Sequence, residues 1–255
     1  MLLAIDVGNT HTVFGIWDRD NWRAIWRRAT DPSETSDQIG AWLEVVLKRE
    51  GLTNVRGAVC ASVVPRLDTA ISEVCREWVR TPLQFLRSGV AVGLDVVYEP
   101  PTSVGADRLA NALAAREGWG SPVIVVDFGT ATKFDVVDIA GRFVGGAILP
   151  GVKLSAEALF AKAAKLPTVE IVAPVRALGQ STQDALRSGI VLGYADAVEG
   201  LLGRLQREVG EATAIATGGL GEPFLELCPS LSAYIPTLTL DGLVIAAGLL
   251  RPEIV

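Results

Sequence analysis

Two aspartates, Asp6 and Asp127, stand at the ends of apolar segments, and each is followed by a glycine and by hydroxyl residues. Asp6 ends LLAID and precedes Val-Gly-Asn-Thr, and Asp127 ends PVIVVD and precedes Phe-Gly-Thr-Ala-Thr. A carboxylate can bind a cation, and a glycine allows backbone N–H groups to approach phosphate oxygens. An ordinary surface turn uses the same residue types, but the repeated pattern favours a site for a nucleotide and its metal ion.

Both turns need strands to hold them, and apolar runs bounded by glycine, proline or aspartate predict such strands. Helical spacing of apolar residues predicts a helix over 36–50. A longer helix is expected after Gly179, where Ser181 and Asp184 suit a capping box. Strands and helices that alternate in this way indicate an α/β fold. The predicted strands are 2–6, 11–18, 55–64, 122–127, 132–139, 142–148 and 212–219.

The chain also repeats itself at a larger scale. When Asp6 is set against Asp127, AIDVGNTHTVFGIWD matches VVDFGTATKFDVVD in pattern, and later VRGAVCASVVPRL matches ATAIATGGLGEPFL. Two pairs in the same order indicate two related halves, 1–117 and 118–255, with a boundary near REGWGSP (116–122). Because ligands commonly bind between domains, we expect the two Asp-Gly turns to form two sides of a phosphate clamp.

Composition narrows the class of protein. The chain has 255 residues, 49% of them hydrophobic, and a net charge of −6, which does not favour nucleic acid as a partner. No apolar run approaches the ~18 residues that a membrane span needs, and the N-terminus does not resemble a signal peptide. The cysteines are scattered without a metal-binding spacing. We therefore expect a cytoplasmic enzyme with reduced thiols and no membrane partner.

Several common catalytic motifs are absent. In GAILPGVK, Val152 separates Gly151 from Lys153, so the P-loop pattern is not met. No GxGxxG follows a strand, which counts against a Rossmann dinucleotide site. His11 is the only histidine, and no G-x-S-x-G accompanies it, so a serine hydrolase triad is not indicated.

Five motifs together resemble those of type III pantothenate kinases, over essentially the whole chain. DVGNT or TGG alone is unspecific, because sugar kinases and actin-like ATPases have similar loops, but GADR combined with DFGTAT is specific. The resemblance implies the acetate kinase/sugar kinase/heat-shock protein/actin fold: two duplicated actin-like (ribonuclease H-like) α/β lobes around a central cleft, in a homodimer. The motifs are DVGNT (6–10), GADR (105–108), DFGTAT (127–132), GGAILPG (145–151) and TGG (217–219).

The resemblance also implies an activity, the transfer of the γ-phosphoryl group of ATP to the terminal hydroxyl of pantothenate. This reaction gives 4'-phosphopantothenate, the first step of coenzyme A biosynthesis. The family needs a divalent metal such as Mg²⁺ and usually a monovalent cation, K⁺ or NH₄⁺. By the same resemblance Asp6 would lie near magnesium, and Asp127 would be a ligand of the monovalent cation.

Further roles follow from the match to the family's motifs. Asp107 matches the catalytic base. The ATP contacts would be Asp6, Val7, Gly8, Asn9, Thr10, His11, Thr12, Val13 and Thr130. The pantothenate contacts would be Tyr98, Gly105, Ala106, Asp107, Arg108 and Thr182, the last of which coincides with the predicted helix start, where anions are favoured.

Two local alternatives stay open from the sequence. GADR could be a plain helix start, at which Asp107 caps the helix and Arg108 is solvated. The family commonly has DFGTATT, whereas this chain has Lys133 after DFGTAT. Lys133 could point outward from its strand, or its ammonium could approach Asp127 and replace or weaken the monovalent cation.

Two rival functions also remain. A regulatory or accessory protein could keep this fold without catalysis, although the set of Asp6, Asp107, Arg108 and Asp127 is intact. A kinase of another small carboxylic acid or of a sugar could share the fold, although GADR and the short chain do not favour it.

Overall fold

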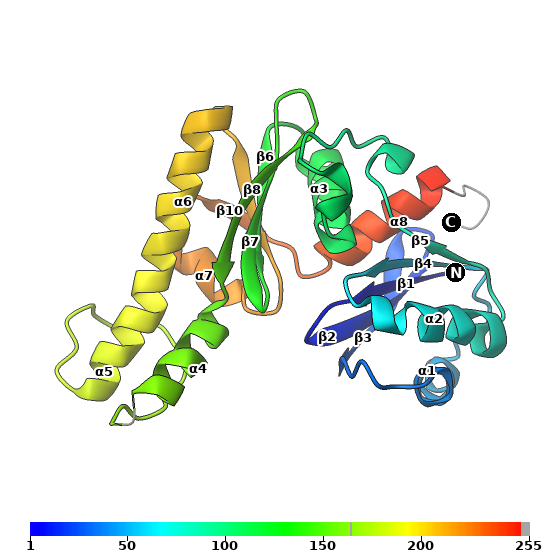
Figure 1. The fold of residues 1–255 in the computed structure, drawn as a ribbon, viewed down its shortest axis with the longest axis horizontal. Coiled ribbons are helices and arrows are strands. Elements are labelled where there is room, and N and C mark those ends of the chain that lie inside the picture. The colour runs from blue at the N-terminus through cyan, green and yellow to red at the C-terminus, as the bar shows by residue number, and fades with distance from the viewer. Residues whose placement is uncertain (164, 251–255) are drawn as a thin grey trace. The chain divides into compact units, whose positions relative to one another are not determined.

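The structure, a computed structural model, describes residues 1–163 and 165–250. The chain divides into two compact units (Figure 1). Unit 1 consists of Met1–Ala114 together with the helix α8 (Leu238–Leu250), and unit 2 is the continuous segment Ala115–Thr237. Each unit contains one five-stranded sheet.

The sheet of unit 1 has the strand order β3-β2-β1-β4-β5. β2 is antiparallel to β1 and β3, whereas β4 is parallel to β1, and β5 is parallel to β4. Side chains of α1 and α2 pack on one face of this sheet in a core that includes Phe14, Leu43 and Ile71. The strands are β1 (Leu2–Val7), β2 (His11–Asp18), β3 (Asn21–Ala29), β4 (Gly57–Ser62) and β5 (Leu83–Phe85).

The helices of unit 1 are α1 (Ser36–Arg49), α2 (Pro65–Glu73), a π-helical continuation at Val74–Val79 and α8, with 3₁₀ turns at Val90–Val92 and Pro101–Ser103. α3 (Ala106–Trp119) begins in unit 1 and continues into unit 2, which starts at Ala115. α1 begins with a complete capping box, in which Thr35 and Gln38 each satisfy the other's backbone N–H. α8 is apolar on nearly all sides and packs on β1 and β4.

The sheet of unit 2 has the order β10-β9-β6-β7-β8, with β7 antiparallel to β6 and β8, and β9 parallel to both β6 and β10. Its core includes Phe128, Phe134, Val198 and Phe224. The elements are β6 (Val123–Phe128), β7 (Ala131–Val137), β8 (Phe143–Pro150), α4 (Val152–Lys162), α5 (Thr182–Arg187), a π-helical segment (Ser188–Leu192), α6 (Gly193–Val209), β9 (Thr213–Thr217), α7 (Glu222–Leu227) and β10 (Leu231–Tyr234).

The two sheets have the same topology, since a central strand pairs on one side with an antiparallel hairpin and on the other with parallel strands. Asp6 pairs with Val13 in the first sheet and Asp127 with Lys133 in the second. The predicted fold class and internal duplication are therefore confirmed. β3, β5 and β10 were not predicted from the sequence.

The division expected from the sequence, 1–117 and 118–255, differs from the observed units at its C-terminal end. α8 belongs to unit 1 because its apolar surface covers the sheet there. Thr239 donates a hydrogen bond to Asn111 Oδ1 at 2.8 Å, which links α8 to α3. Among the described residues, no helix combines the length and apolarity needed to cross a membrane.

Gly242 lies where α8 packs against the backbone of α3. A Cβ atom there would lie 2.0 Å from the carbonyl oxygen of Ala110, a backbone atom that cannot move without the helix. We expect Gly242→Ala to lower the free energy of unfolding by about 1–3 kcal/mol, as overpacking does. Urea unfolding followed by circular dichroism measures this change.

Gly200→Ala in α6 is the matched control, because nothing lies within 4 Å of its Cβ position. Alanine there should be neutral or stabilising by about 0.5–1 kcal/mol. A Gly242→Ala protein as stable as the wild type would contradict the close contact.

Candidate active site

The β1–β2 turn of unit 1 is a tight loop held by side chains from outside it. The Gly8 N–H donates to the carbonyl oxygen of His11 at 3.1 Å, and the Thr30 hydroxyl donates to the Gly8 carbonyl oxygen at 2.7 Å. Thr30 Oγ1 also lies 2.9 Å from Thr12 Oγ1. Thr30 follows β3 and was not singled out from the sequence, where no motif marks it. The loop is thus ordered by its neighbours.

The predicted ATP contacts in this loop differ in what they can offer. Val7 and Thr12 are buried, so Val7 can serve a ligand only through its backbone, whereas Asn9, Thr10 and His11 are exposed. Glycine at position 8 keeps the turn close, because a Cβ there would lie 3.0 Å from the His11 carbonyl oxygen. The loop therefore offers backbone groups and exposed side chains beside the Asp6 carboxylate.

The GADR segment forms the start of α3. Asp107 lies in the first turn of this helix, and its Oδ1 accepts a hydrogen bond from the Arg108 backbone N–H at 2.9 Å. A Cβ on Gly105 would lie 2.5 Å from the same Oδ1. The Asp107 carboxylate therefore occupies space that only glycine at 105 leaves open.

Arg108 is buried and lies beside Tyr98. Its residue exposure is 7%, and its guanidinium carbon is 5.7 Å from the centroid of the Tyr98 ring, within the range of a cation–π contact. The alternative of a solvated Arg108 is therefore wrong. Within unit 1 the structure brings Tyr98, Gly105, Asp107 and Arg108 together.

Asn111, one turn further along α3, is a polar residue that the sequence analysis missed. It is fully buried, and its Nδ2 donor has no hydrogen-bond partner in the part of the chain that the structure describes. No sequence motif marks it, since a single asparagine in a helical segment is common.

The DFGTAT turn of unit 2 is enclosed by two other motifs. The Gly151 N–H donates to the Thr130 carbonyl oxygen at 2.9 Å, and a Cβ on Gly151 would lie 2.4 Å from that oxygen. Gly218 of TGG has φ +88°, and a Cβ there would lie 2.5 Å from Asp127 Oδ1. The glycines of GGAILPG and TGG thus allow close packing around the turn that holds Asp127 and Thr130.

Lys133 pairs with Asp127 across the β6–β7 hairpin. The Lys133 Nζ atom lies 2.8 Å from Asp127 Oδ2. The alternative in which Lys133 points away from Asp127 is therefore wrong.

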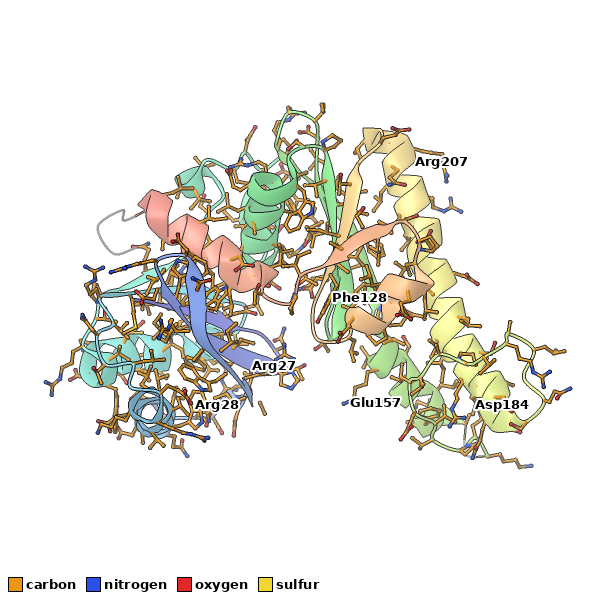
Figure 2. All side chains as sticks on the ribbon, turned by 180° about the vertical axis from the view of Figure 1, so that it is seen from behind. Arg27, Arg28, Phe128, Glu157, Asp184 and Arg207 are labelled. Carbon is orange, nitrogen blue, oxygen red and sulfur yellow. The ribbon has the colours of Figure 1, made fainter. Side chains whose placement is uncertain are left out.

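Thr182 lies apart from the Asp127 turn, although both belong to unit 2. It is the exposed first residue of α5, which Ser181 caps by accepting a hydrogen bond from the Asp184 N–H at 3.1 Å. The predicted N-cap is confirmed. Figure 2 shows Asp184, two residues from Thr182, well separated from Phe128, which follows Asp127.

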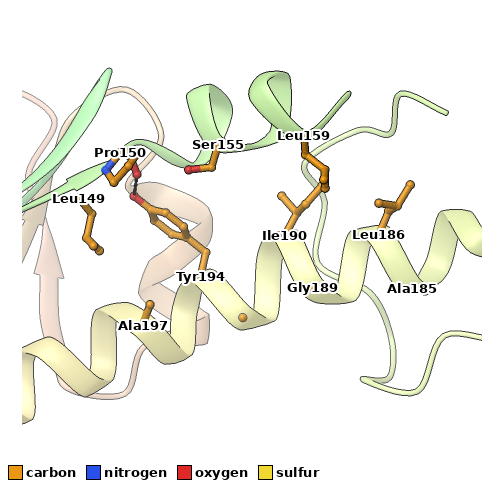
Figure 3. Close-up of a pocket in the computed structure, with 11 residues that line it drawn as sticks. Leu149, Pro150, Ser155, Leu159, Ala185, Leu186, Gly189, Ile190, Tyr194 and Ala197 are labelled. Atoms are coloured by element: carbon orange, nitrogen blue, oxygen red, sulfur yellow. Dashed lines mark hydrogen bonds between the residues drawn. The ribbon is translucent and has the colours of Figure 1, made fainter. Parts of the chain in front are cut away.

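A separate apolar pocket of about 410 Å³ lies between α4 and the α5–α6 segment (Figure 3). Leu159 and Ile190 line it, and the Tyr194 hydroxyl closes one end, 2.9 Å from the Pro150 carbonyl oxygen and 2.7 Å from Thr132 Oγ1. Its lining contains no charged side chain. The pocket therefore does not suit a phosphate or a carboxylate.

Thiol chemistry is not indicated by the structure. Cys60, Cys75 and Cys228 are free and buried. Burial raises the pKa of the Cys75 and Cys228 thiols to about 12, and it raises that of Cys60 as well. Since the thiolate is the reactive form, these residues are parts of the core.

The described residues also limit the kind of metal site. They contain no group of three or more histidine, cysteine, aspartate or glutamate side chains placed to hold a metal ion. Magnesium is usually bound by one or two carboxylates together with substrate phosphates. The Asp6 carboxylate beside the β1–β2 loop fits this second arrangement.

Two sheets of the same order, each with an Asp-x-Gly turn after its central strand, define the two-lobed α/β fold of sugar kinases, Hsp70 and actin. Similar solved structures include a Campylobacter jejuni protein assigned to the Baf family of transcriptional activators (19% identical, 96% of each chain, TM-score 0.62). Another is the Clostridium difficile activator of 2-hydroxyisocaproyl-CoA dehydratase (11% identical, 97% of this chain and 92% of that chain, TM-score 0.54). At these identities the likeness concerns the fold alone.

The sequence comparisons are more specific. The model of the type III pantothenate kinase family matches residues 2–204. The chain is 46% identical over 247 residues to the type III pantothenate kinase of Paramagnetospirillum magneticum, covering 95% of both. It is 45% identical over 257 residues to that of Rhodospirillum rubrum, covering 99% of this chain and 100% of the relative. The chain belongs to the type III pantothenate kinase family.

The contact between position 105 and Asp107 generates a prediction. Gly105→Ala should displace the Asp107 carboxylate with little effect on folding, because the atom that must move ends a side chain. We expect kcat to fall about 10–100-fold, as small misplacements of reacting groups can cause, while Tm changes little. Gly118→Ala, in the same helix with nothing within 4 Å, is the control. Equal activity of the two variants would contradict the prediction.

Proposed function

We propose that this chain transfers the γ-phosphoryl group of ATP to the terminal hydroxyl of pantothenate, the first step of coenzyme A biosynthesis. The observation that carries the proposal is the cluster of Asp107, buried Arg108 and Tyr98 at the start of α3, in a chain related to type III pantothenate kinases over 95% of its length. We further propose that the protein acts in the cytoplasm as a homodimer.

Arg108 is the group proposed to bind the pantothenate carboxylate. A buried guanidinium forms strong, charge-assisted hydrogen bonds with a carboxylate. The Tyr98 ring beside it restricts the orientation of the planar guanidinium, and the N-terminal end of α3 adds a favourable potential for an anion. Thr182, at the N-terminus of α5, is proposed as a further substrate contact.

Asp107 is proposed to accept the proton of the attacking hydroxyl. The hydrogen bond from the Arg108 N–H holds the carboxylate in one orientation. Phosphoryl transfer depends chiefly on positioning and on neutralisation of charge, so a carboxylate held in place can serve as the base. Gly105 leaves the space for it, and Gly105 and Ala106 contribute backbone to the same substrate segment.

The β1–β2 loop, from Asp6 to Val13, is proposed to bind the phosphates of ATP, with Thr130 of the second turn as another contact. Asp6 would hold Mg²⁺, which would offset the negative charge of the phosphates. The chain's own contribution is the tight turn at Gly8, which Thr30 ties to the rest of the sheet.

The first test is the release of ADP from Mg-ATP by the purified protein, with pantothenate, with sugars, or with other small carboxylic acids. Turnover that depends on pantothenate supports the proposal. Preference for another acceptor would favour a different kinase activity. Intact ATP binding without turnover on any of these acceptors would favour a regulatory protein.

Asp107→Asn tests the catalytic base. We expect kcat to fall about 10²–10⁴-fold, the range typical of the loss of a general base, while the Kd for Mg-ATP changes little. Asp37→Asn, in the first turn of α1 in the same unit, is the control and should leave kcat unchanged. A nearly normal kcat of the Asp107→Asn protein would show that Asp107 is not the catalytic base.

Arg108→Gln tests the carboxylate contact. Because a hydrogen bond to a charged group contributes about 1.5–3 kcal/mol, KM for pantothenate should rise about 10–100-fold. An analogue in which the carboxylate is replaced by an alcohol provides the control. With this analogue the KM values of the wild type and the variant should differ much less than with pantothenate. If the difference in KM were as large as with pantothenate, Arg108 would have a structural role instead.

A further inference from the structure

The Lys133–Asp127 pair follows directly from the register of the β6–β7 hairpin. The two residues are directly opposite each other in the antiparallel pair, so their side chains leave the same face of the sheet. The side chains are only 18% and 13% exposed, respectively, and the Nζ–Oδ2 distance is 2.8 Å. This distance is typical of a charge-assisted hydrogen bond. Two adjacent strands therefore hold the ammonium against the carboxylate.

The other carboxylate oxygen of Asp127 is confined as well. Position 218 must be glycine for Oδ1 to lie where it does, since a Cβ there would come within 2.5 Å of it. Gly129, in the turn itself, also faces Oδ1, with a Cβ position 3.7 Å away. The Asp127 carboxylate is thus enclosed between the TGG segment and the ammonium of Lys133.

A monovalent cation, which the family resemblance implies at Asp127, does not fit this arrangement. A second positive charge bound to the same carboxylate would lie close to the ammonium of Lys133. Two unit charges 4 Å apart repel each other by ~4 kcal/mol at the effective dielectric constant of a protein surface. The lysine ammonium also supplies the N–H donors that a bound NH₄⁺ would supply.

We propose that the ammonium of Lys133 takes the place of the monovalent cation beside Asp127, so that nucleotide binding and phosphoryl transfer in this chain do not depend on K⁺ or NH₄⁺. The claim about phosphoryl transfer rests on the proposed function. The claim about nucleotide binding rests on the geometry of the β6–β7 hairpin. Lys133 is a positioning residue in this account, because it acts through Asp127 and its turn.

The direct test uses the wild-type protein and needs no substitution. The Kd for Mg-ATP is measured by calorimetry in KCl, in NH₄Cl and in choline chloride at equal ionic strength, and turnover is measured in the same buffers. We expect both quantities to agree within about twofold across the three salts. A loss of tenfold or more in choline chloride, in either quantity, would overturn the inference.

Lys133→Thr supplies the converse test, because it introduces the residue that is usual in the family. In choline chloride this variant should bind Mg-ATP at least about tenfold more weakly than the wild type, the scale of one charge-assisted hydrogen bond. KCl should restore the binding and raise Tm. Lys153→Thr, which removes an exposed lysine of α4, should behave as the wild type.

A Lys133→Thr protein that is equally active and equally stable in all three salts would also overturn the inference. The binding readout keeps this test separate from the proposed function. If the wild type bound Mg-ATP without any phosphorylation of pantothenate, the proposed function would fail, whereas the salt dependence of Kd would still decide the role of Lys133.

Discussion

The central strand of each sheet is buried on both faces, and this constraint governs the positions of Asp6 and Asp127. β1 and β6 have the same burial pattern, in which four buried residues precede a partly exposed aspartate. Each strand is hydrogen-bonded on both sides, so its backbone groups are satisfied and only the end of the strand can carry a charge. Asp6 and Asp127 therefore occupy equivalent positions, each followed by a turn that needs glycine.

The glycines of the motifs serve two different purposes, which the atoms around each glycine reveal. Gly105 leaves room for a functional carboxylate, whereas Gly151 and Gly218 let backbone segments close around the DFGTAT turn. A motif that resembles a ligand loop in the sequence can thus contribute chiefly by packing. The same close packing confines Asp127, so its ion pair with Lys133 determines what else can bind there.

The sequence was sufficient to predict the duplicated α/β fold, because the two Asp-Gly turns and the strands around them repeat in order. It was not sufficient for β3, because the exposed Ile25 and the partly buried Arg28 break the alternation of apolar and polar residues there. The burial of Arg108 could not be predicted either, since arginine is usually exposed and only the neighbouring Tyr98 and helix start explain it. The Lys133–Asp127 pair could not be predicted without the register of the β6–β7 hairpin. The place of α8 could not be predicted without knowing which of the two sheets this apolar helix covers.

The assignment of α8 to unit 1 has a consequence for the order in which the chain can fold during synthesis. Unit 2 is one continuous segment and can complete its core as soon as Thr237 has left the ribosome. Unit 1 must wait, because the helix that covers β1 and β4 is made last although those strands are made first. Contacts between segments so distant in sequence form slowly. Nascent chains therefore expose an apolar sheet face for most of their elongation, a period in which chaperones can protect it.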